Sequence, residues 1–485
     1  MQASLHHKGL IAVAVGLGLG LIGMTLYGLL GFPFFFVLPL IGFLFLFALL
    51  RLDKFALIIG ASAPLSVNVN DIAGGLGMSF PTEPIIIILF GLLIFYFIKH
   101  FSVPLHFIKH PLVLLVIGYV LWLFISSVFS QHPMVSLKFS LARTWYIVVF
   151  FFGGLWFFSK YRNIRFFLIW QVVFTLLVCL FTIYMHNEFR FERGASYGIS
   201  WPFFPDHGMY AACIAFAVPI LCLFIFKPQR FSIGRIGHAA CIVALIIILF
   251  AIVTSYTRAA WLSLIAALGV YWLLYLRIKF KYIMAVLVLV VSTVIINQDK
   301  ILYSLEANKQ GSSDELEGHV KSVSNITTDP SNMERVNRWS CAIRMAQDRP
   351  ITGFGPGTFV FEYGAFQKTN ELTIISTFFG DLGDAHSEYF SALAETGYIG
   401  LALWASIFIY SMALAFNVYR RTQSFAIKSN VLVALLALTT YYVHGFLNNY
   451  TQYDKVAVPL WCFLAILISL DIRTKKDLNK NSQLD

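Results

Sequence analysis

Asp299-Lys300-Ile301-Leu302-Tyr303-Ser304-Leu305-Glu306-Ala307-Asn308 lies at the start of residues 298–397, the only long stretch of the chain that is not a hydrophobic span. Nearly continuous apolar segments precede this stretch, and three more apolar spans follow it. A polar segment of this length, held between membrane helices, is where we expect the chemistry of the protein.

The composition indicates an integral membrane protein. The chain has 485 residues, of which 59% are hydrophobic and 12% are charged, whereas about a quarter of the residues of a soluble protein carry charge. The first apolar run, from Gly9 to Gly31, is too long for the core of a signal peptide and is not followed by a cleavage site, so we interpret it as a retained helix.

The apolar runs predict an all-α polytopic fold with 12 to 14 transmembrane helices, because a bilayer core requires about 20 apolar residues per helix. Fourteen spans are predicted, and the third is short: 9–30, 33–50, 54–66, 84–98, 111–129, 140–158, 165–185, 208–226, 238–254, 259–276, 282–297, 398–416, 429–447 and 455–470. The predicted parts are N-terminal helices (1–297), one large, mostly helical periplasmic loop (298–397), C-terminal helices (398–472) and a cytoplasmic tail (473–485).

The basic residues predict the orientation. One set of alternate short connections holds 21 Lys and Arg residues and the other set holds six, and the richer side is cytoplasmic by the positive-inside rule. Both termini are therefore expected in the cytoplasm and the long loop on the outer side. In the bacterial inner membrane that the family resemblance given below implies, that outer side is the periplasm. The net charge of +11 is explained by this asymmetry, so the sequence does not call for nucleic acid as a partner.

Two groups of polar residues bear on the chemistry. Five of the six cysteines lie singly among apolar residues, so neither a disulfide framework nor a metal site is suggested. Four arginines lie on the poorer, outer side: Arg143, Arg190, Arg193 and Arg258. A buried arginine is unfavourable in a membrane unless it faces protein or water. These residues indicate either a cationic cavity that binds phosphate through the forked guanidinium or interfacial anchors that reach the headgroups.

His386 is the candidate base. Asp384 resembles an N-cap and Gly397 a helix stop, so we expect a short helix over 385–396. On it His386 would share the apolar face of Tyr389 and stay neutral beside the positive helix end. The alternative is a structural histidine at a helix start. The turn Gly353-Phe354-Gly355-Pro356-Gly357 offers backbone amides to an anion.

Three elements, taken in order, resemble the bacterial O-antigen ligase and polymerase superfamily. Thr257-Arg258-Ala259-Ala260-Trp261-Leu262 is similar to its S-R-(G/A)-x-W-L element. Arg335-Val336-Asn337-Arg338-Trp339, followed by the segment from Asp348 to Phe359, is similar to its R-x-x-x-W … P-x-x-G-x-G-x-G-x-F element. Asp384-Ala385-His386-Ser387-Glu388-Tyr389, with Ala394-Glu395-Thr396-Gly397, is similar to its H-(N/S)-x-x-L … E-x-G element. The chain departs from the pattern at Ser387, where asparagine is common, and at Tyr389-Phe390, where the family is rich in leucine.

The resemblance implies a polytopic glycosyltransferase of the GT-C type that uses a glycan on undecaprenyl pyrophosphate and requires neither metal nor cofactor. It implies His386 as the base and Arg258 and Arg335 as ligands of the pyrophosphate, with Arg190 or Arg193 as a further contact. We add Arg338 and Arg143 as further candidate phosphate ligands.

The acceptor stays open at this point. Lipid A core would make the protein a ligase, another repeat unit would make it a polymerase, and a protein hydroxyl would make it an oligosaccharyltransferase. The first two are favoured. A transporter of lipid-linked sugar is the alternative from another class, against which stand the lack of an evident internal repeat and the long outer loop.

Overall fold

The computed structural model describes residues 47–48, 50–69, 78–100, 105–231, 233–297, 330–373, 376 and 383–481. The first two predicted spans and the first third of the long loop lie largely or wholly outside these ranges. Within them the chain is almost entirely helical, and two three-residue strands form a single antiparallel hairpin in which Val67 pairs with Phe80.

The elements, in chain order, are as follows: α3 (Leu52–Ala61), β1 (Val67–Val69), β2 (Met78–Phe80), α4 (Thr82–His100), α5 (Leu105–Ile108), α6 (Pro111–Val128), α7 (Pro133–Tyr146), α8 (Gly153–Phe158), α9 (Tyr161–Glu188), α10 (Arg193–Ser196), α11 (His207–Ala215), α12 (Ala217–Phe226), α13 (Arg235–Thr254), α14 (Arg258–Tyr275), α15 (Phe280–Ile296), α18 (Pro330–Asp348), α19 (Phe359–Glu362), α20 (Glu388–Arg421), α21 (Phe425–Leu447) and α22 (Asp454–Asn481). A π-helical stretch, Ile147–Phe152, joins α7 to α8.

The all-α membrane fold is confirmed. Among the described residues, nine helices are long and apolar enough to cross a bilayer, and two shorter apolar helices accompany them, Thr82–Ile98 and Phe280–Val290. The third predicted span, 54–66, is wrong as a full crossing: α3 has ten residues, about half the length a bilayer core requires, and the chain then turns into the β-hairpin.

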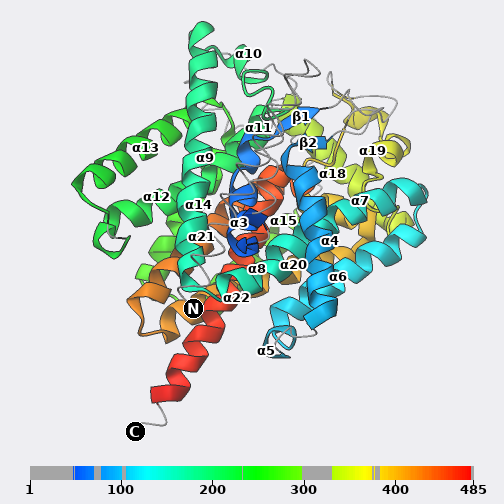
Figure 1. Cartoon of the computed structure of the whole chain (residues 1–485). Helices are drawn as coiled ribbons and strands as arrows, with labels where there is room; N and C mark the ends of the chain where they lie inside the picture. Colours follow the sequence, from blue (N-terminus) through cyan, green and yellow to red (C-terminus); the bar gives the residue numbers. More distant parts are fainter. Residues whose placement is uncertain are drawn as a thin grey trace, which may run out of the picture.

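The two ends of the helix bundle differ in character (Figure 1). The β-hairpin, α10, α18 and α19 lie at one end, and α5 and the C-terminus lie at the other. We call these the loop end and the basic end, because the connections around α5 and the C-terminus carry the larger group of Lys and Arg side chains. Helix α22 forms the core: its residues from Val456 to Leu470 are nearly all buried.

Local sequence explains where several helices begin. Pro111 and Pro133 occupy the first turns of α6 and α7, where a missing N–H removes no helical hydrogen bond. The Asp206 side chain accepts from the backbone N–H of Met209 at 2.8 Å and caps α11. Such a cap satisfies one of the otherwise unpaired amides of the first turn, so the helix starts at a defined residue.

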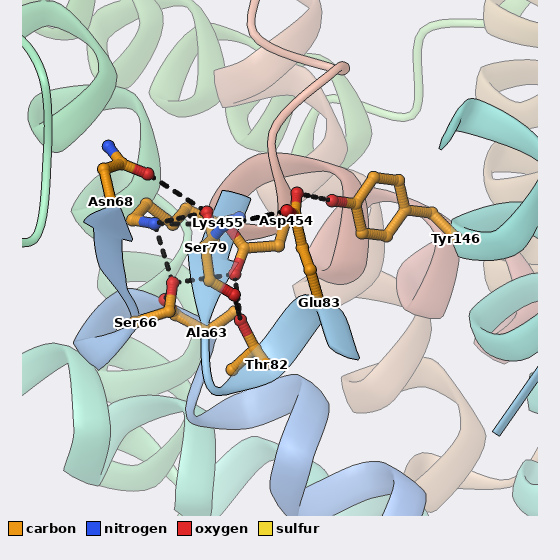
Figure 2. Close-up of polar contacts among 9 residues, drawn as sticks. All are labelled: Ala63, Ser66, Asn68, Ser79, Thr82, Glu83, Tyr146, Asp454 and Lys455. Carbon is orange, nitrogen blue, oxygen red and sulfur yellow. Dashed lines mark hydrogen bonds and ion pairs between the residues drawn. The ribbon is translucent and has the colours of Figure 1, made fainter. Parts of the chain in front are cut away.

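A buried ion pair ties the first described part of the chain to the last helix (Figure 2). Asp454 and Lys455 are fully buried and lie 3.2 Å apart. Lys455 Nζ donates to Ser66 Oγ at 2.7 Å. The hydroxyls of Ser66 and Thr82 donate to Asp454 Oδ2 at 2.7 and 2.5 Å. Because each charge has partners, the pair is tolerated in the core, and it fixes the β-hairpin to the loop end of α22.

Candidate active site at the loop end of the bundle

His386 lies two residues before helix α20 in the left-handed backbone region, with φ of 47°. Ser387, not Asp384, is the N-cap of α20, and its side chain accepts from the amide three residues further on. The expected helix over 385–396 is therefore wrong at its start. Its end is correct, because Gly397 breaks α20 with φ of 68° and ψ of −172°.

Arg338 holds the segment that precedes His386. Its Nη1 donates to the Asp384 carbonyl oxygen at 2.9 Å, and its Nε donates to Glu334 Oε1 at 2.8 Å. The side-chain amide of Gln452 donates to the Asp384 carboxylate at 3.4 Å. Arg338 is buried and directs its donors at protein groups, so the geometry supports a positioning role for this arginine.

Glu388 holds the segment that follows His386. Its carboxylate accepts from the Tyr441 hydroxyl at 2.5 Å and from both the amide and the hydroxyl of Thr451 at 2.8 Å. Arg143 Nη2 lies 3.8 Å from the same carboxylate. His386 is therefore fixed from both sides, which is what a left-handed non-glycine residue requires if its strain is to persist.

Arg143, an expected phosphate ligand, lies between helices. Its Nη1 donates to the Tyr119 hydroxyl at 2.6 Å, and its guanidinium lies over the Phe139 ring at 4.7 Å. The side chain is 11% exposed. With Glu388 beside it, the charge is matched within the protein, and the geometry supports a role in holding α6, α7 and α20 together.

The glycine-rich turn binds α20. We call residues 350–359 and 394–398 the glycine joint. The amide of Gly355 donates to the Glu395 carbonyl oxygen at 2.8 Å, and the amide of Phe359 donates to the Glu395 carboxylate at 3.3 Å. These amides donate their hydrogen bonds to Glu395 of α20, so the turn binds this helix and is not an anion site. Glu395 thus serves the turn and not His386.

Helix α6 completes the joint from its loop end. Trp122 Nε1 donates to the Thr396 carbonyl oxygen at 2.9 Å. Ser126 Oγ lies 2.5 Å from the Thr352 carbonyl oxygen and 3.1 Å from that of Glu395. The break in α20 is therefore bonded on two sides, so the first turns of α20, and with them His386, keep a fixed position relative to α6.

Helix α18 presents Arg335 to His386. Trp339 stacks on Phe390 with a centroid distance of 5.0 Å and meets Phe446 edge to face at 5.2 Å. Arg335 lies one helical turn before Trp339, on the same face. This docking places the Arg335 charge close enough to act on the His386 ring.

Two more histidines lie close enough to Arg335 to be affected by its charge. The Arg335 charge acts on His207 and on His444. His207 Nδ1 lies 2.8 Å from the Ser255 carbonyl oxygen, so it carries the proton and Nε2 is left as an acceptor. The His444 ring is buried, has no hydrogen-bond partner among the described residues, and lies 5.9 Å from the Tyr450 ring. We call His207, His386 and His444 the histidine cluster.

Two of the remaining arginines, Arg193 and Arg258, are linked to His207 of this cluster. Arg258 is the first residue of α14, and the preceding Thr257 donates its hydroxyl to the His207 carbonyl oxygen at 3.2 Å. The Arg193 charge acts on His207. Arg190 is exposed in the turn before α10, with φ of 50°. The fold thus brings the charges of Arg193 and Arg335 to His207 and places Arg258 directly after the Thr257 contact with the His207 backbone.

Burial, with the charges of Arg335 and Arg338, lowers the pKa of His386 to about 3. The sequence predicted a pKa at or below the ordinary value for a different reason, the positive end of a helix. The causes found in the structure are burial first and then the charges of Arg335 and Arg338. The ring is neutral at any pH near 7 and is able to accept a proton.

His207 and His444 were missed by the sequence reasoning. A signal was available for both: each lies at the loop end of an apolar span, directly after the Asp206 cap of α11 or in the last turn of α21. Ionisable side chains at the ends of membrane spans often mark a functional site.

Comparison with known proteins agrees with the three sequence elements. A family model described as O-antigen ligase matches residues 243–405, which make up a third of the chain. The matched region contains Arg258, Arg335, Arg338 and His386. A search of curated proteins finds no match. The matched region supports membership of the chain in the O-antigen ligase and polymerase superfamily.

Proposed function

We propose that the protein transfers a glycan from undecaprenyl pyrophosphate to a hydroxyl of lipid A core, as an O-antigen ligase. The observation that carries the proposal is the neutral, rigidly held His386 beside Arg335 within the region that matches the family. A base and a cation side by side suit a reaction in which a hydroxyl attacks and a pyrophosphate departs.

The reaction requires one bond to form and one to break. The acceptor oxygen bonds to the anomeric carbon, while the bond from that carbon to the pyrophosphate oxygen breaks. His386 takes the acceptor proton, and undecaprenyl pyrophosphate leaves with the bonding electron pair. Direct displacement inverts the anomeric configuration. Arginines aimed at the departing charge stabilise the transition state in a partly dry site.

The arginines divide into two groups in this proposal. Arg335 and Arg193 hold the pyrophosphate, because their charges act on the histidine cluster. Arg258 joins them because it follows Thr257, which bonds the His207 backbone, and the exposed Arg190 is a further phosphate contact. Arg338 and Arg143 position His386 through Asp384 and Glu388 instead. These two make their closest contacts to protein groups, so their removal is expected to disturb geometry more than donor affinity.

The low pKa of free His386 fits a base that is switched on by its substrate. Without a bound donor, burial and the charges of Arg335 and Arg338 oppose protonation of the ring. A bound pyrophosphate places negative charge beside Arg335, so it offsets part of the effect of that arginine and raises the pKa of His386. Basicity then increases only when a donor is present.

We place the site at the periplasmic face of the bacterial inner membrane, with both termini in the cytoplasm. The 21-to-6 distribution of basic residues supports this orientation, because the loop end that carries His386 is opposite the basic end. A lipid-carried glycan would then reach the site from the outer leaflet.

The test is single-turnover transfer from a defined undecaprenyl-pyrophosphate glycan to purified lipid A core, with donor binding measured separately. His386→Ala, His207→Ala and His444→Ala are compared. We expect only His386→Ala to lose about a hundred- to ten-thousandfold in the transfer step with donor binding nearly intact. Loss of transfer in His444→Ala with normal transfer in His386→Ala would move the base to His444.

The acceptor is tested in the same assay. Offering repeat-unit glycan on undecaprenyl pyrophosphate in place of lipid A core distinguishes a polymerase from a ligase, and a protein hydroxyl tests the oligosaccharyltransferase alternative. Movement of intact donor across vesicles without any transfer would indicate a transporter and refute the proposal.

A further inference from the structure

A large apolar cavity lies at the basic end of the bundle, away from the histidine cluster. Its volume is about 960 Å³, at the upper end of the roughly 300–1,000 Å³ typical of ligand pockets. The wall is formed by α4, α5, α6, α8 and α22, and includes Phe97, Ile117, Leu155 and Trp156. The proposed reaction uses no residue of this cavity.

The cavity ends at two basic side chains. Arg473 and Lys476 line it on α22, and both also line a second, smaller cavity of about 320 Å³ that is bordered by Ser424 and Asp477. An apolar space and a more polar space thus meet at the same pair of cations. Among the described residues, Asp477 is the only acidic side chain lining either cavity, so the charge at their shared boundary is positive.

Contacts within the protein fix Arg473 at this boundary. Its Nη2 donates to the Ser159 carbonyl oxygen, and its guanidinium lies 5.4 Å from the Tyr161 ring centroid. A held guanidinium loses less freedom on binding an anion than a mobile one does. The site is therefore partly organised before a ligand arrives.

An unpartnered hydroxyl lines the apolar cavity. Ser469 is 2% exposed, and its Oγ has no hydrogen-bond partner among the described residues. A buried polar group without a partner is unfavourable. The hydroxyl therefore indicates a ligand that carries a polar group a short way along its length, beyond the charged head that Arg473 and Lys476 would hold.

We propose that the two cavities together bind one anionic phospholipid from the leaflet at the basic end. The phosphate lies between Arg473 and Lys476, the glycerol ester region reaches Ser469, and the acyl chains lie along the wall that includes Phe97 and Trp156. Basic pockets between membrane helices on the cytoplasmic side are known to take acidic headgroups. The charged head, polar neck and apolar tails of such a lipid match the three parts of the site in order.

The test uses the full chain reconstituted in phosphatidylcholine bilayers, with spin-labelled phosphatidylglycerol and spin-labelled phosphatidylcholine as the two probes. Electron paramagnetic resonance measures the immobilised fraction of each lipid. Each basic residue near the surface contributes about fivefold to the preference for an anionic lipid, so the pair gives a selectivity of roughly 25-fold. Equal immobilisation of both probes by the wild type would overturn the proposal without any variant.

Three variants make the test specific. The double variant Arg473→Gln, Lys476→Gln should bring the selectivity close to one. Ile117→Trp should place a larger side chain in the apolar cavity and reduce the immobilised fraction of both probes. Lys428→Gln is the matched control, because it removes a basic residue of the same end that lines neither cavity and should leave the selectivity unchanged.

Two further results would overturn the proposal. One is full selectivity in the double variant. The other is displacement of the anionic probe by undecaprenyl phosphate more readily than by unlabelled phosphatidylglycerol, which would make the cavity a donor-lipid site. Glycan transfer is not part of this assay, so its outcome and that of the proposed reaction are independent.

Discussion

Replacing Gly397 by alanine tests whether the glycine joint holds the catalytic histidine in place. Gly397 has φ of 68° and ψ of −172°, a region that is essentially restricted to glycine. A Cβ there would lie 2.5 Å from the Ile351 carbonyl carbon and 2.6 Å from the Pro350 carbonyl oxygen. Both neighbours are backbone atoms, so the joint has to open.

The magnitude follows from these distances. The atom nearest to such a Cβ is the Ile351 carbonyl oxygen, and real Cβ contacts are essentially never under 3.0 Å. The Ile351 carbonyl group therefore has to retreat by more than about 0.5 Å, which is the tolerance of a catalytic arrangement. Since a displacement of about 1 Å lowers a rate about a hundredfold, we expect Gly397→Ala to lose about tenfold in transfer. The backbone strain adds about 1–3 kcal/mol of destabilisation.

The assay is single-turnover transfer together with thermal unfolding in the same detergent. Gly269→Ala is the matched control, because a Cβ at that position of α14 meets no atom within 4 Å. In a helix interior alanine stabilises by roughly 0.5–1 kcal/mol relative to glycine. Gly397→Ala with unchanged transfer and an unchanged unfolding temperature would refute the idea that the joint constrains His386.

The remaining predictions address the site and the orientation. His386 acts as a neutral base and has a pKa of about 3 in the free protein, so kcat/KM should stay level on acidification to about pH 4. A bound donor offsets the Arg335 charge and raises this pKa, so on acidification kcat should begin to fall at a higher pH than kcat/KM does. Identical pH profiles of kcat and kcat/KM would contradict this. Arg335→Ala and Arg258→Ala should each lower donor affinity about ten- to a hundredfold, and Arg258→Lys should recover only part, as titration with labelled donor will measure. A reporter at Lys428 should lie in the cytoplasm and one at Ser313 in the periplasm, and a cytoplasmic Ser313 would remove the proposed active site from the outer face.

Apolar spacing was sufficient to predict most of the fold, because a bilayer leaves the backbone few alternatives to the helix. The break at Gly397 was also predictable, since a glycine directly before an apolar span is a common stop. The start of α20 was not: Asp384 and Ser387 both suit an N-cap, and the choice depends on Arg338 and Gln452, which bind Asp384 from distant parts of the chain.

The site itself was only partly predictable. The sequence elements indicated Arg258, Arg335 and His386, yet their meeting with His207 and His444 depends on how α11, α18 and α21 pack, which spacing along one chain does not reveal. The glycine turn was misread for the same reason. Its amides looked available for an anion until Glu395, nearly 40 residues away, was seen to accept from them.

The Asp454–Lys455 pair also has a consequence for how the protein is made. Ser66 and Asp454 are separated by 388 positions, so at a synthesis rate of about 5–20 residues per second roughly 20–80 s pass between their appearances. During that interval Ser66 and Thr82 have been synthesised but lack the Asp454 carboxylate that both bind in Figure 2. The last helix to emerge from the ribosome is thus the one that closes the β-hairpin onto the bundle, and a chain stopped before Asp454 leaves the earlier half of the molecule unfinished and open to quality-control proteolysis.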